Sequence, residues 1–252
     1  MLESTTALRY VTPLREGGSL PGIVEAEDFG TYVVKFRGAG QGPKVLVAEV
    51  VVGELARRLG IPVPELKTIE FDEAIGLREP DPEVQDLLVA SAGLNLAVDF
   101  LPGSLGYDGS SFRPDADLAA RILWLDALVA NVDRTWRNPN LLVWHRRLWA
   151  IDHGAALYFH HAWTTEERFS LQPYDATDHI LRAYAGGIDR ADEELAPMVT
   201  EDLLGEVLGL VPAEWLASDT AHPSVEATRR AYVAFLLARL ERRPAWLPAA
   251  AA

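Results

Sequence analysis

NVDRTWRNPN, residues 131–140, and IDHG, residues 151–154, are the two stretches that decide how this chain folds and what chemistry it carries. Asp133 is followed five residues later by Asn138, and a second aspartate, Asp152, stands in the later stretch. Asp and Asn are common in loops because they cap helices and form turns, so the D-x4-N spacing is weak evidence by itself. Its weight depends on whether the three side chains meet.

The residues between these stretches predict that they do meet. Asn138 precedes Pro139, which biases the Asn138 backbone toward an extended conformation. Residues 141–151 are apolar at both ends with a polar HisArgArg turn between, which predicts a hairpin that returns the chain to Asp152. We therefore expect Asp133, Asn138 and Asp152 around one point; the alternative is three polar loop residues without a common site.

This set of side chains matches the requirements of phosphoryl transfer. One carboxylate, from Asp133, would orient the acceptor hydroxyl. The amide oxygen of Asn138 and the carboxylate of Asp152 would hold the Mg²⁺ ions that bridge the phosphates of ATP.

A lysine upstream fits the same chemistry. Lys35 lies in TYVVKF, residues 31–36, whose β-branched and aromatic residues predict a strand. Lys35 either extends from an edge strand into solvent or points into a cleft to bind phosphates. For the second role it needs an anion, and the helix predicted after it offers Glu49 and Glu54. We favour Glu49, since Glu54 could equally be a solvated surface residue.

Two further segments are candidates for nucleotide binding. Gly17, Gly18 and Ser19 stand between two predicted strands, where they form either an ordinary hairpin turn or a loop whose N–H groups approach phosphate. The segment Asp99, Phe100 and Leu101 precedes a Pro-Gly break, and its backbone could bind an adenine edge at a junction between lobes.

The overall pattern predicts an α+β fold with two lobes. We expect a β-rich lobe at residues 1–101 with one main helix, residues 44–59, and a mostly helical lobe at residues 102–252. The predicted strands are residues 7–14, 23–26, 31–36, 66–71 and 96–103. The helices predicted in the second lobe are residues 118–131, 178–185, 201–208 and 225–242. The charged, proline-bearing stretch 79–85 is expected to be a loop.

Composition limits the class of protein. The chain has 252 residues, 49% of them hydrophobic and 24% charged, which is ordinary globular composition. Its net charge of −14 argues against general nucleic-acid binding, because phosphate backbones repel an acidic surface. We expect a cytoplasmic protein without a membrane span, since the chain has no cysteine and no long apolar run.

The histidines and tryptophans near these stretches have mostly structural explanations. His153, His160 and His161 match no metal-ligand spacing, so we expect them to be structural or surface residues. Most tryptophans are expected in the core, but Trp136 lies in the loop after Asp133 and could line an acceptor pocket.

Taken in order, the glycine-rich turn, YVVKF, the helix running into LARRLGIPVPE, NVDRTWRNPN and IDHG resemble the HipA-like kinases. The resemblance covers roughly residues 9–158. It implies the two-lobed fold that these enzymes share with phosphoinositide kinases and, more distantly, protein kinases. It also implies that Asp133 is the catalytic aspartate, that Asn138 and Asp152 bind Mg²⁺, and that Lys35 and Glu49 form the phosphate-binding pair.

The resemblance has departures and alternatives. Thr135 stands where HipA-like and lipid kinases usually carry histidine. Asn131 stands where aminoglycoside-type kinases usually have histidine, so a small-molecule or lipid kinase is the second reading. A third is a nucleotide-binding pseudokinase that acts as an interaction module. The family can phosphorylate a serine in its glycine-rich loop, here Ser19, which is otherwise a turn residue. A protein Ser/Thr hydroxyl is the acceptor that we favour.

Overall fold

The computed structural model of the chain describes residues 1–14, 20–163 and 165–248. Helices and strands are both abundant and largely segregated along the chain, so the predicted α+β class is confirmed. The chain divides into two compact units. The first unit comprises Met1–Leu46 and Pro64–Pro102, and the second comprises Val47–Val63 and Gly103–Ala252.

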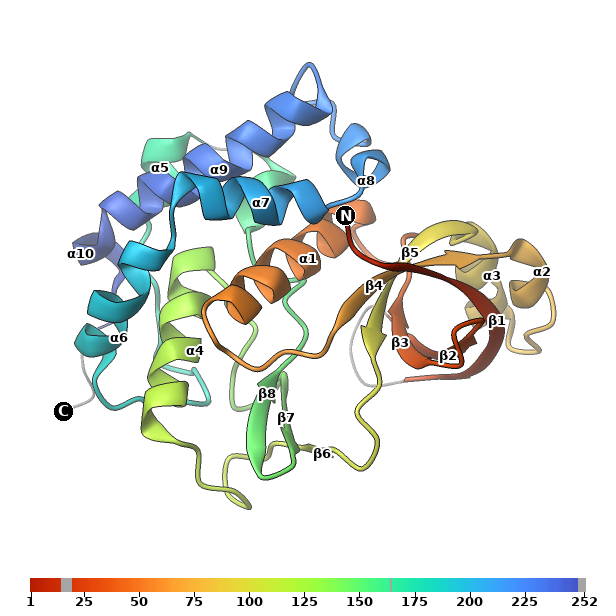
Figure 1. Ribbon diagram of the computed structural model, residues 1–252, viewed down its shortest axis with the longest axis horizontal. Helices are drawn as coiled ribbons and strands as arrows, with labels where there is room; N and C mark the ends of the chain where they lie inside the picture. The colour runs from red at the N-terminus through yellow and green to blue at the C-terminus, as the bar shows by residue number, and fades with distance from the viewer. Residues whose placement is uncertain (15–19, 164, 249–252) are drawn as a thin grey trace. The chain divides into compact units, whose positions relative to one another are not determined.

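The first unit is built on a closed barrel of five strands (Figure 1). The strands are β1 (Ser4–Pro13), β2 (Gly22–Ala26), β3 (Thr31–Lys35), β4 (Leu66–Phe71) and β5 (Gly93–Asp99). They pair in the order β1-β2-β3-β5-β4, and β4 closes the barrel by pairing in parallel with β1. The remaining pairings are antiparallel, and β3 places Lys35 opposite Leu96 of β5.

The barrel forms because its strands alternate apolar and polar positions. In β2, Val24 and Ala26 are buried while Ile23 and Glu25 are only partly so, as the two-residue period of a strand requires. The inward side chains form one core in which Phe36 meets Phe71 edge to face, with ring centroids 5.6 Å apart. Burial of this alternating set holds the barrel together.

Two short helices of this unit differ from the sequence prediction. They are α2 (Glu73–Gly76) and α3 (Pro82–Ala90), and α3 overlaps the stretch 79–85 that was expected to be a loop. The prediction was wrong because Pro82 occupies the first turn of α3, where its missing N–H is not needed. Asp81 caps the helix by accepting a hydrogen bond from the Glu83 N–H at 3.1 Å.

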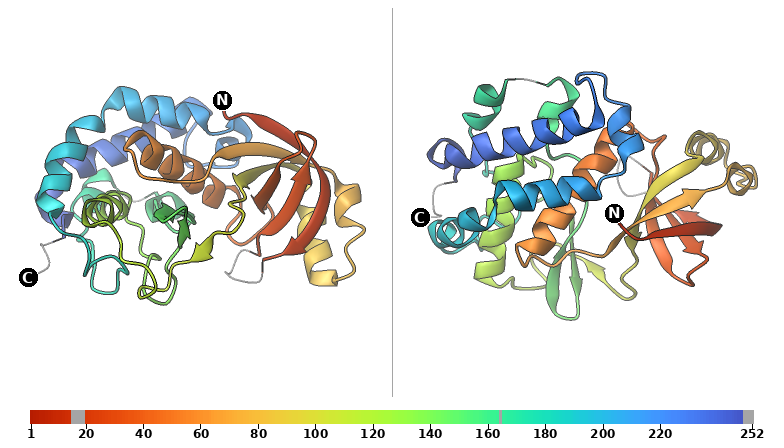
Figure 2. Two further views of the ribbon diagram at one scale, coloured as in Figure 1. Left: turned by 60° about the horizontal axis from the view of Figure 1, so that its bottom comes forward. Right: turned by 45° about the horizontal axis from the view of Figure 1, so that its top comes forward.

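The second unit is mostly helical (Figures 1 and 2). Its helices are α1 (Pro43–Arg58, whose first turn belongs to the first unit), α4 (Ala116–Val129), α5 (Glu166–Ser170), α6 (Ile188–Leu195), α7 (Glu201–Leu210), α8 (Ala213–Ala217), α9 (Val225–Glu241) and α10 (Arg243–Trp246). Its small sheet comprises β6 (Leu105–Gly106), β7 (Leu141–Trp144) and β8 (Arg147–Ala150). Helix α9 packs against α5, α7 and α8, and α4 packs against α6. None of the described helices is long and apolar enough to cross a membrane.

The helix predicted at residues 178–185 does not form. This segment is a series of turns, and His179 forms an isolated β-bridge with Thr135. Its backbone groups bond to the neighbouring loop: the Trp136 N–H donates to the Asp178 carbonyl at 3.2 Å, and the Ile180 N–H donates to the Arg134 carbonyl at 3.3 Å. These tertiary hydrogen bonds replace the helical ones that the local sequence favours.

A buried arginine fixes the end of helix α4. Arg239 of α9 is fully buried and donates to the Ala127 carbonyl at 3.1 and 2.7 Å and to the Phe169 carbonyl at 2.7 Å. Its guanidinium lies over the rings of Phe169 and Trp246. Burial lowers the pKa of Arg239 to about 10, so the group remains charged at neutral pH. The last turn of α4 is therefore held in place by the C-terminal part of the chain.

Candidate active site

The loop that carries Asp133 begins where helix α4 ends. Asp115 caps the start of α4 by accepting from the Leu118 N–H at 2.9 Å. At the other end, Ala130 adopts a left-handed conformation with φ +53°, which stops the helix. The Asn131 N–H then donates to the Asp126 carbonyl at 2.8 Å, and the chain turns into the loop.

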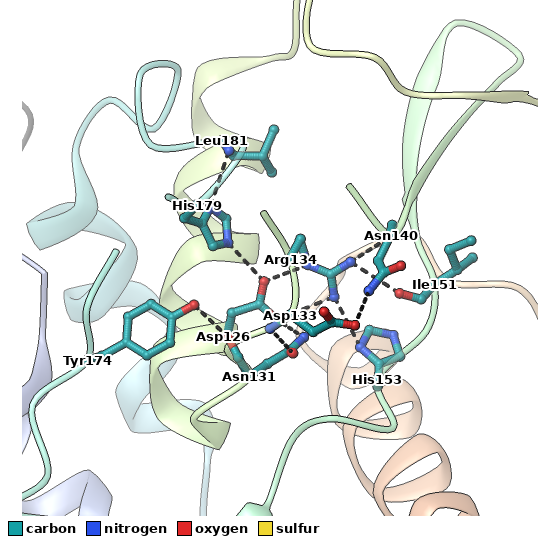
Figure 3. Close-up of polar contacts among 10 residues, drawn as sticks. All are labelled: Asp126, Asn131, Asp133, Arg134, Asn140, Ile151, His153, Tyr174, His179 and Leu181. Carbon is teal, nitrogen blue, oxygen red and sulfur yellow. Dashed lines mark hydrogen bonds and ion pairs between the residues drawn. The ribbon is translucent and has the colours of Figure 1, made fainter. Parts of the chain in front are cut away.

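The centre of the site is a buried carboxylate that the sequence analysis did not single out (Figure 3). Asp126, on the last turns of α4, is fully buried. Its Oδ2 accepts from Arg134 Nε at 2.6 Å and from His179 Nε2 at 3.0 Å. Its Oδ1 accepts from Asn131 Nδ2 at 2.9 Å. One carboxylate therefore holds α4, the Asp133 loop and the 174–181 segment together.

The charge on Asp126 is maintained despite its burial. Burial by itself raises the pKa of this carboxyl, but the Arg134 charge and the His179 hydrogen bond outweigh it and hold the pKa well below its usual range. The Arg134 side chain is fully buried too, so the two form an ion pair from which water is excluded. Such a pair fixes geometry, because removing either partner would leave a buried charge without compensation.

Arg134 connects residues 131–140 with residues 151–154. Its Nη1 donates to the carbonyls of Asn140 and of Ile151, the latter at 3.1 Å. Its Nη2 lies 3.3 Å from Nδ1 of His153. Figure 3 shows this single guanidinium in contact with both Ile151 and His153. These residues precede and follow Asp152 in the chain, so the Asp152 backbone is held beside the loop that carries Asp133.

The hydrogen bonds also determine which nitrogen carries the proton in each histidine. The Leu181 N–H donates to His179 Nδ1 at 3.2 Å, so the proton of His179 is on Nε2 and points at Asp126. Arginine can only donate, so Nδ1 of His153 accepts from Arg134 and its proton is on Nε2. Both rings therefore belong to the buried network around Asp126 and Arg134.

Asp133 and Asn138 are in direct contact. Asn138 Nδ2 donates to Asp133 Oδ2 at 2.8 Å, and Asn140 Nδ2 donates to the same oxygen at 3.2 Å. The Asp133 N–H in turn donates to Asn131 Oδ1 at 3.2 Å. Asp133 is partly exposed and Asn138 is exposed, so both side chains are accessible from solvent.

Asp152 has a backbone conformation that few residues other than glycine, asparagine and aspartate adopt. It follows strand β8 and has φ +58°, in the left-handed region that costs a non-glycine residue roughly 1–2 kcal/mol. The hairpin before it turns through His145 and Arg146, whose φ values of +46° and +60° are typical of a type I′ turn. Strain of this kind persists only where the surroundings impose it, and Arg134 supplies that constraint at Ile151.

Lys35 and Glu49 belong to different units of the chain. Lys35 ends strand β3 of the first unit and is 9% exposed, while Glu49 lies in the part of α1 that belongs to the second unit and is 2% exposed. Glu54, the alternative anion, is buried rather than solvated, and it accepts from Arg57 Nε at 3.3 Å. Glu54 therefore already has a cation on its own helix.

The other predicted nucleotide-binding residues lie in the first unit. Gly17, Gly18 and Ser19 fall outside the described residues. The N–H groups of Asp99 and Phe100 donate to the carbonyls of Glu65 and Thr31 at 2.8 and 3.1 Å. Those two donors therefore serve the barrel.

Asp126, Arg134, Asn140 and His179 are the site residues that sequence reasoning missed. One signal was available: Asp126 is the single charged residue in the otherwise apolar run ILWLDALVA, and such a carboxylate needs a buried partner. Arg134, next to Asp133, was the nearest candidate in the loop that follows. The hydrogen bond of His179 to Asp126 could not be predicted, because residues 178–185 were expected to form a helix.

Comparison with known proteins identifies the family of the chain. A protein-family model described as HipA-like kinase matches residues 9–247. The chain belongs to this family. It is therefore a kinase, and the fold and family expected from its motifs are confirmed.

Solved structures also resemble the chain. A proinflammatory kinase of Helicobacter pylori, CtkA, is similar with a TM-score of 0.55 and 12% sequence identity, over 95% of this chain and 94% of that one. This likeness shows a protein-kinase-like fold. The Golgi casein kinase, solved with Mn and ADP bound, is similar with a TM-score of 0.44 and 13% identity, over 96% of this chain and 73% of that one. No curated protein sequence matches the chain.

Proposed function

We propose that this HipA-like kinase uses ATP and Mg²⁺ to phosphorylate a serine or threonine hydroxyl of a protein. The observation that carries the proposal is the network in which Asp133 and Asn138 are hydrogen-bonded while Arg134 holds both neighbours of Asp152. Asp133, Asn138 and Asp152 carry the carboxylate and amide oxygens that phosphoryl transfer uses, which supports the proposal.

Asp133 is assigned the role of orienting the acceptor. Two amide groups, from Asn138 and Asn140, hold its Oδ2, so Oδ1 is the oxygen that we assign to the acceptor hydroxyl. In the transfer, the acceptor oxygen forms a bond to the γ-phosphorus as the bond to the β-phosphate oxygen breaks. The hydroxyl proton passes to Asp133, and ADP leaves.

Asn138 and Asp152 are assigned to the metal. Their donor atoms are an amide oxygen and a carboxylate, and hard oxygen ligands suit Mg²⁺. When bound, Mg²⁺ neutralises charge on the phosphates. Since Asn138 Nδ2 donates to Asp133, its Oδ1 is the atom assigned to the ion.

Lys35 and Glu49 are assigned to the nucleotide phosphates. A carboxylate as buried as Glu49 needs a cation or several donors, and Glu54 is already paired with Arg57. The chain order of β3 followed by α1 is the one that the family resemblance implies for this pair. We assign the adenine contact to the segment Asp99–Leu101 and the phosphate loop to Gly17, Gly18 and Ser19. The lobes remain proposed at residues 1–101 and 102–252.

The test is phosphate transfer from γ-labelled ATP in the presence of Mg²⁺, to the protein itself and to Ser/Thr peptides. We expect Asp133→Asn to reduce transfer by at least about a hundredfold with an unchanged unfolding midpoint. Asp189→Asn is the matched control, since Asp189 is an exposed aspartate on α6. Nucleotide binding without any transfer, unaffected by Asp133→Asn, would identify a pseudokinase instead.

A further inference from the structure

A cavity lies beside the loop that carries Asp133. Its volume is about 330 Å³. The lining includes Val132, Thr135, Tyr174, Asp175, Thr177 and Asp178, together with Arg134 and His179 of the buried network. Because Val132 and Arg134 are the two chain neighbours of Asp133, whatever occupies this cavity contacts the loop that carries the assigned catalytic aspartate.

The volume of the cavity is at the lower end of the range for ligand pockets and is large enough for one long side chain. Pockets for drug-sized ligands measure roughly 300–1,000 Å³, and a cavity of roughly 150 Å³ holds benzene. The walls mix apolar surface, from Val132 and the ring of Tyr174, with the carboxylates of Asp175 and Asp178. An aliphatic chain that ends in a cation fits both parts of such a wall.

The charges around the cavity favour a cation. Arg134 is already neutralised by Asp126, so it offers no net charge to a ligand. Hydrogen bonds from the hydroxyl and N–H of Thr177, with a smaller effect from the charge of Arg182, hold the pKa of Asp175 below its usual range, so this carboxylate is charged at neutral pH. Asp178 meets Arg137 at 3.4 Å, but both side chains are more than half exposed, and a pair of that kind is weak.

The exposed surface around the cavity indicates a protein ligand. Val132 and Trp136, on either side of Asp133 in the chain, are large apolar residues with 67% and 58% exposure. The Arg137 guanidinium lies over the Trp136 ring, 4.0 Å from its centroid. Exposed aromatic and Arg side chains are typical of protein interfaces, and this surface extends contact beyond the cavity itself.

We propose that the cavity binds a lysine or arginine side chain of a protein acceptor, close in sequence to the serine or threonine that reaches Asp133. This inference rests on the function proposed above. It assigns a basic consensus to the acceptor, read by Asp175 and Asp178, with Val132 and Tyr174 contacting the aliphatic part of the basic side chain.

The test compares matched peptides. Each peptide contains one serine. One position within four residues of that serine is varied at a time, and it carries Arg, Gln or Glu. With ATP and Mg²⁺, we expect one Arg position to raise kcat/KM about tenfold over Gln and a Glu there to lower it. Equal kcat/KM for the three series would overturn the inference.

Variants of the cavity then show which residues cause the preference for Arg in the peptide. The double variant Asp175→Asn/Asp178→Asn keeps the hydrogen-bond acceptor that caps Thr177, and we expect it to reduce the Arg preference to within about twofold of Gln. Arg137→Gln removes the cation beside Asp178 and should increase the preference. The control is Asp189→Asn together with Glu193→Gln, which also removes two negative charges but from exposed residues of α6. An Arg preference that survives in the double variant places the contact elsewhere and refutes the proposal.

Binding measured without chemistry separates this inference from the proposed function. Fluorescence anisotropy of the labelled Arg and Gln peptides, without ATP, reports the cavity alone. Charge-dependent binding that disappears in the double variant, with no phosphate transfer, would refute the kinase proposal and retain the cavity assignment. Phosphate transfer without charge-dependent peptide binding would retain the kinase proposal and refute the cavity assignment. Phosphorylation of a small hydroxylated diamine but of no peptide would overturn the assignment to a protein acceptor.

Discussion

Two carboxylates, one in each unit, have similar partners in contrasting surroundings. Asp28, at the turn between β2 and β3, and Asp126, on α4, each accept hydrogen bonds from a cationic side chain, from a ring-bearing side chain and from an amide N–H. The donors to Asp28 are Lys67, Tyr32 and the Gly30 backbone; those to Asp126 are Arg134, His179 and Asn131. The side chain of Asp28 is 31% exposed and that of Asp126 is 1% exposed.

Burial changes what the same interactions achieve. In both cases burial raises the pKa and the partners lower it by more, to about 2 for Asp28 and well below the usual range for Asp126. Water can replace the partners of Asp28 but not those of Asp126. The exposed cluster therefore adds modest stability to one turn, whereas the buried one determines where the Asp133 loop lies.

The largest effect is expected from Asp126→Asn. This change leaves Arg134 as an uncompensated buried charge, and we expect the free energy of unfolding to fall by about 3–5 kcal/mol. Urea denaturation of the variant beside the exposed-site control Asp189→Asn measures it. A loss below about 1 kcal/mol would remove the contrast between the two carboxylates.

A smaller loss of stability with a large loss of activity is expected from Arg134→Lys. Lysine keeps the charge but lacks the planar fork that reaches Asp126 and the Asn140 and Ile151 carbonyls together. We expect about 2 kcal/mol of destabilisation and at least about a tenfold fall in kcat. Denaturation and steady-state transfer are measured on the same preparation; full activity would show that Arg134 does not position Asp152.

Acid should destabilise the protein through both carboxylates. Because each has a lower pKa in the folded state than in the unfolded state, each contributes stability above the unfolded value of about 3.9, and that contribution is lost as pH falls toward the folded value. For Asp126 the contribution is on the order of 2 kcal/mol. Unfolding free energies measured between pH 7 and pH 3 should fall less steeply in Asp126→Asn than in wild type; an unchanged slope contradicts the linkage.

The smallest effect is expected from Asp28→Asn. An exposed cluster contributes about 1 kcal/mol or less, and the amide oxygen still accepts the Gly30 N–H. We expect a shift in unfolding free energy below about 1 kcal/mol and unchanged phosphate transfer. A larger loss than that from Arg134→Lys would show that the partners of Asp28 are not replaceable by water.

Features that depend on local sequence could be predicted, whereas features that depend on tertiary contacts could not. Strand β4 was predicted with its observed bounds, Leu66–Phe71, because its β-branched and aromatic residues reflect local geometry. The meeting of the Asp133 loop with the Asp152 segment was predicted too, because a proline and a hairpin specify that path. The Arg134–Asp126 pair was not, since a contact eight residues apart depends on how the loop folds back against α4.

The missed elements have physical reasons as well. Helix α3 was taken for a loop because Pro82 was read without its cap, Asp81. The segment 178–185 was taken for a helix because local preference cannot register hydrogen bonds to residues more than forty positions earlier, such as that from the Ile180 N–H to the Arg134 carbonyl. Tertiary partners decide such segments.

The β-bridge between Thr135 and His179 has a mechanical consequence. It joins the Asp133 loop to the segment that supplies Tyr174, Asp175 and Asp178, so the surface that would select an acceptor is hydrogen-bonded to the loop that would align it. An acceptor that fixes the position of segment 174–179 on binding would therefore also fix the position of the Asp133 loop. Selectivity in such an enzyme should appear in the turnover number as well as in the Michaelis constant, because binding energy is then spent on alignment.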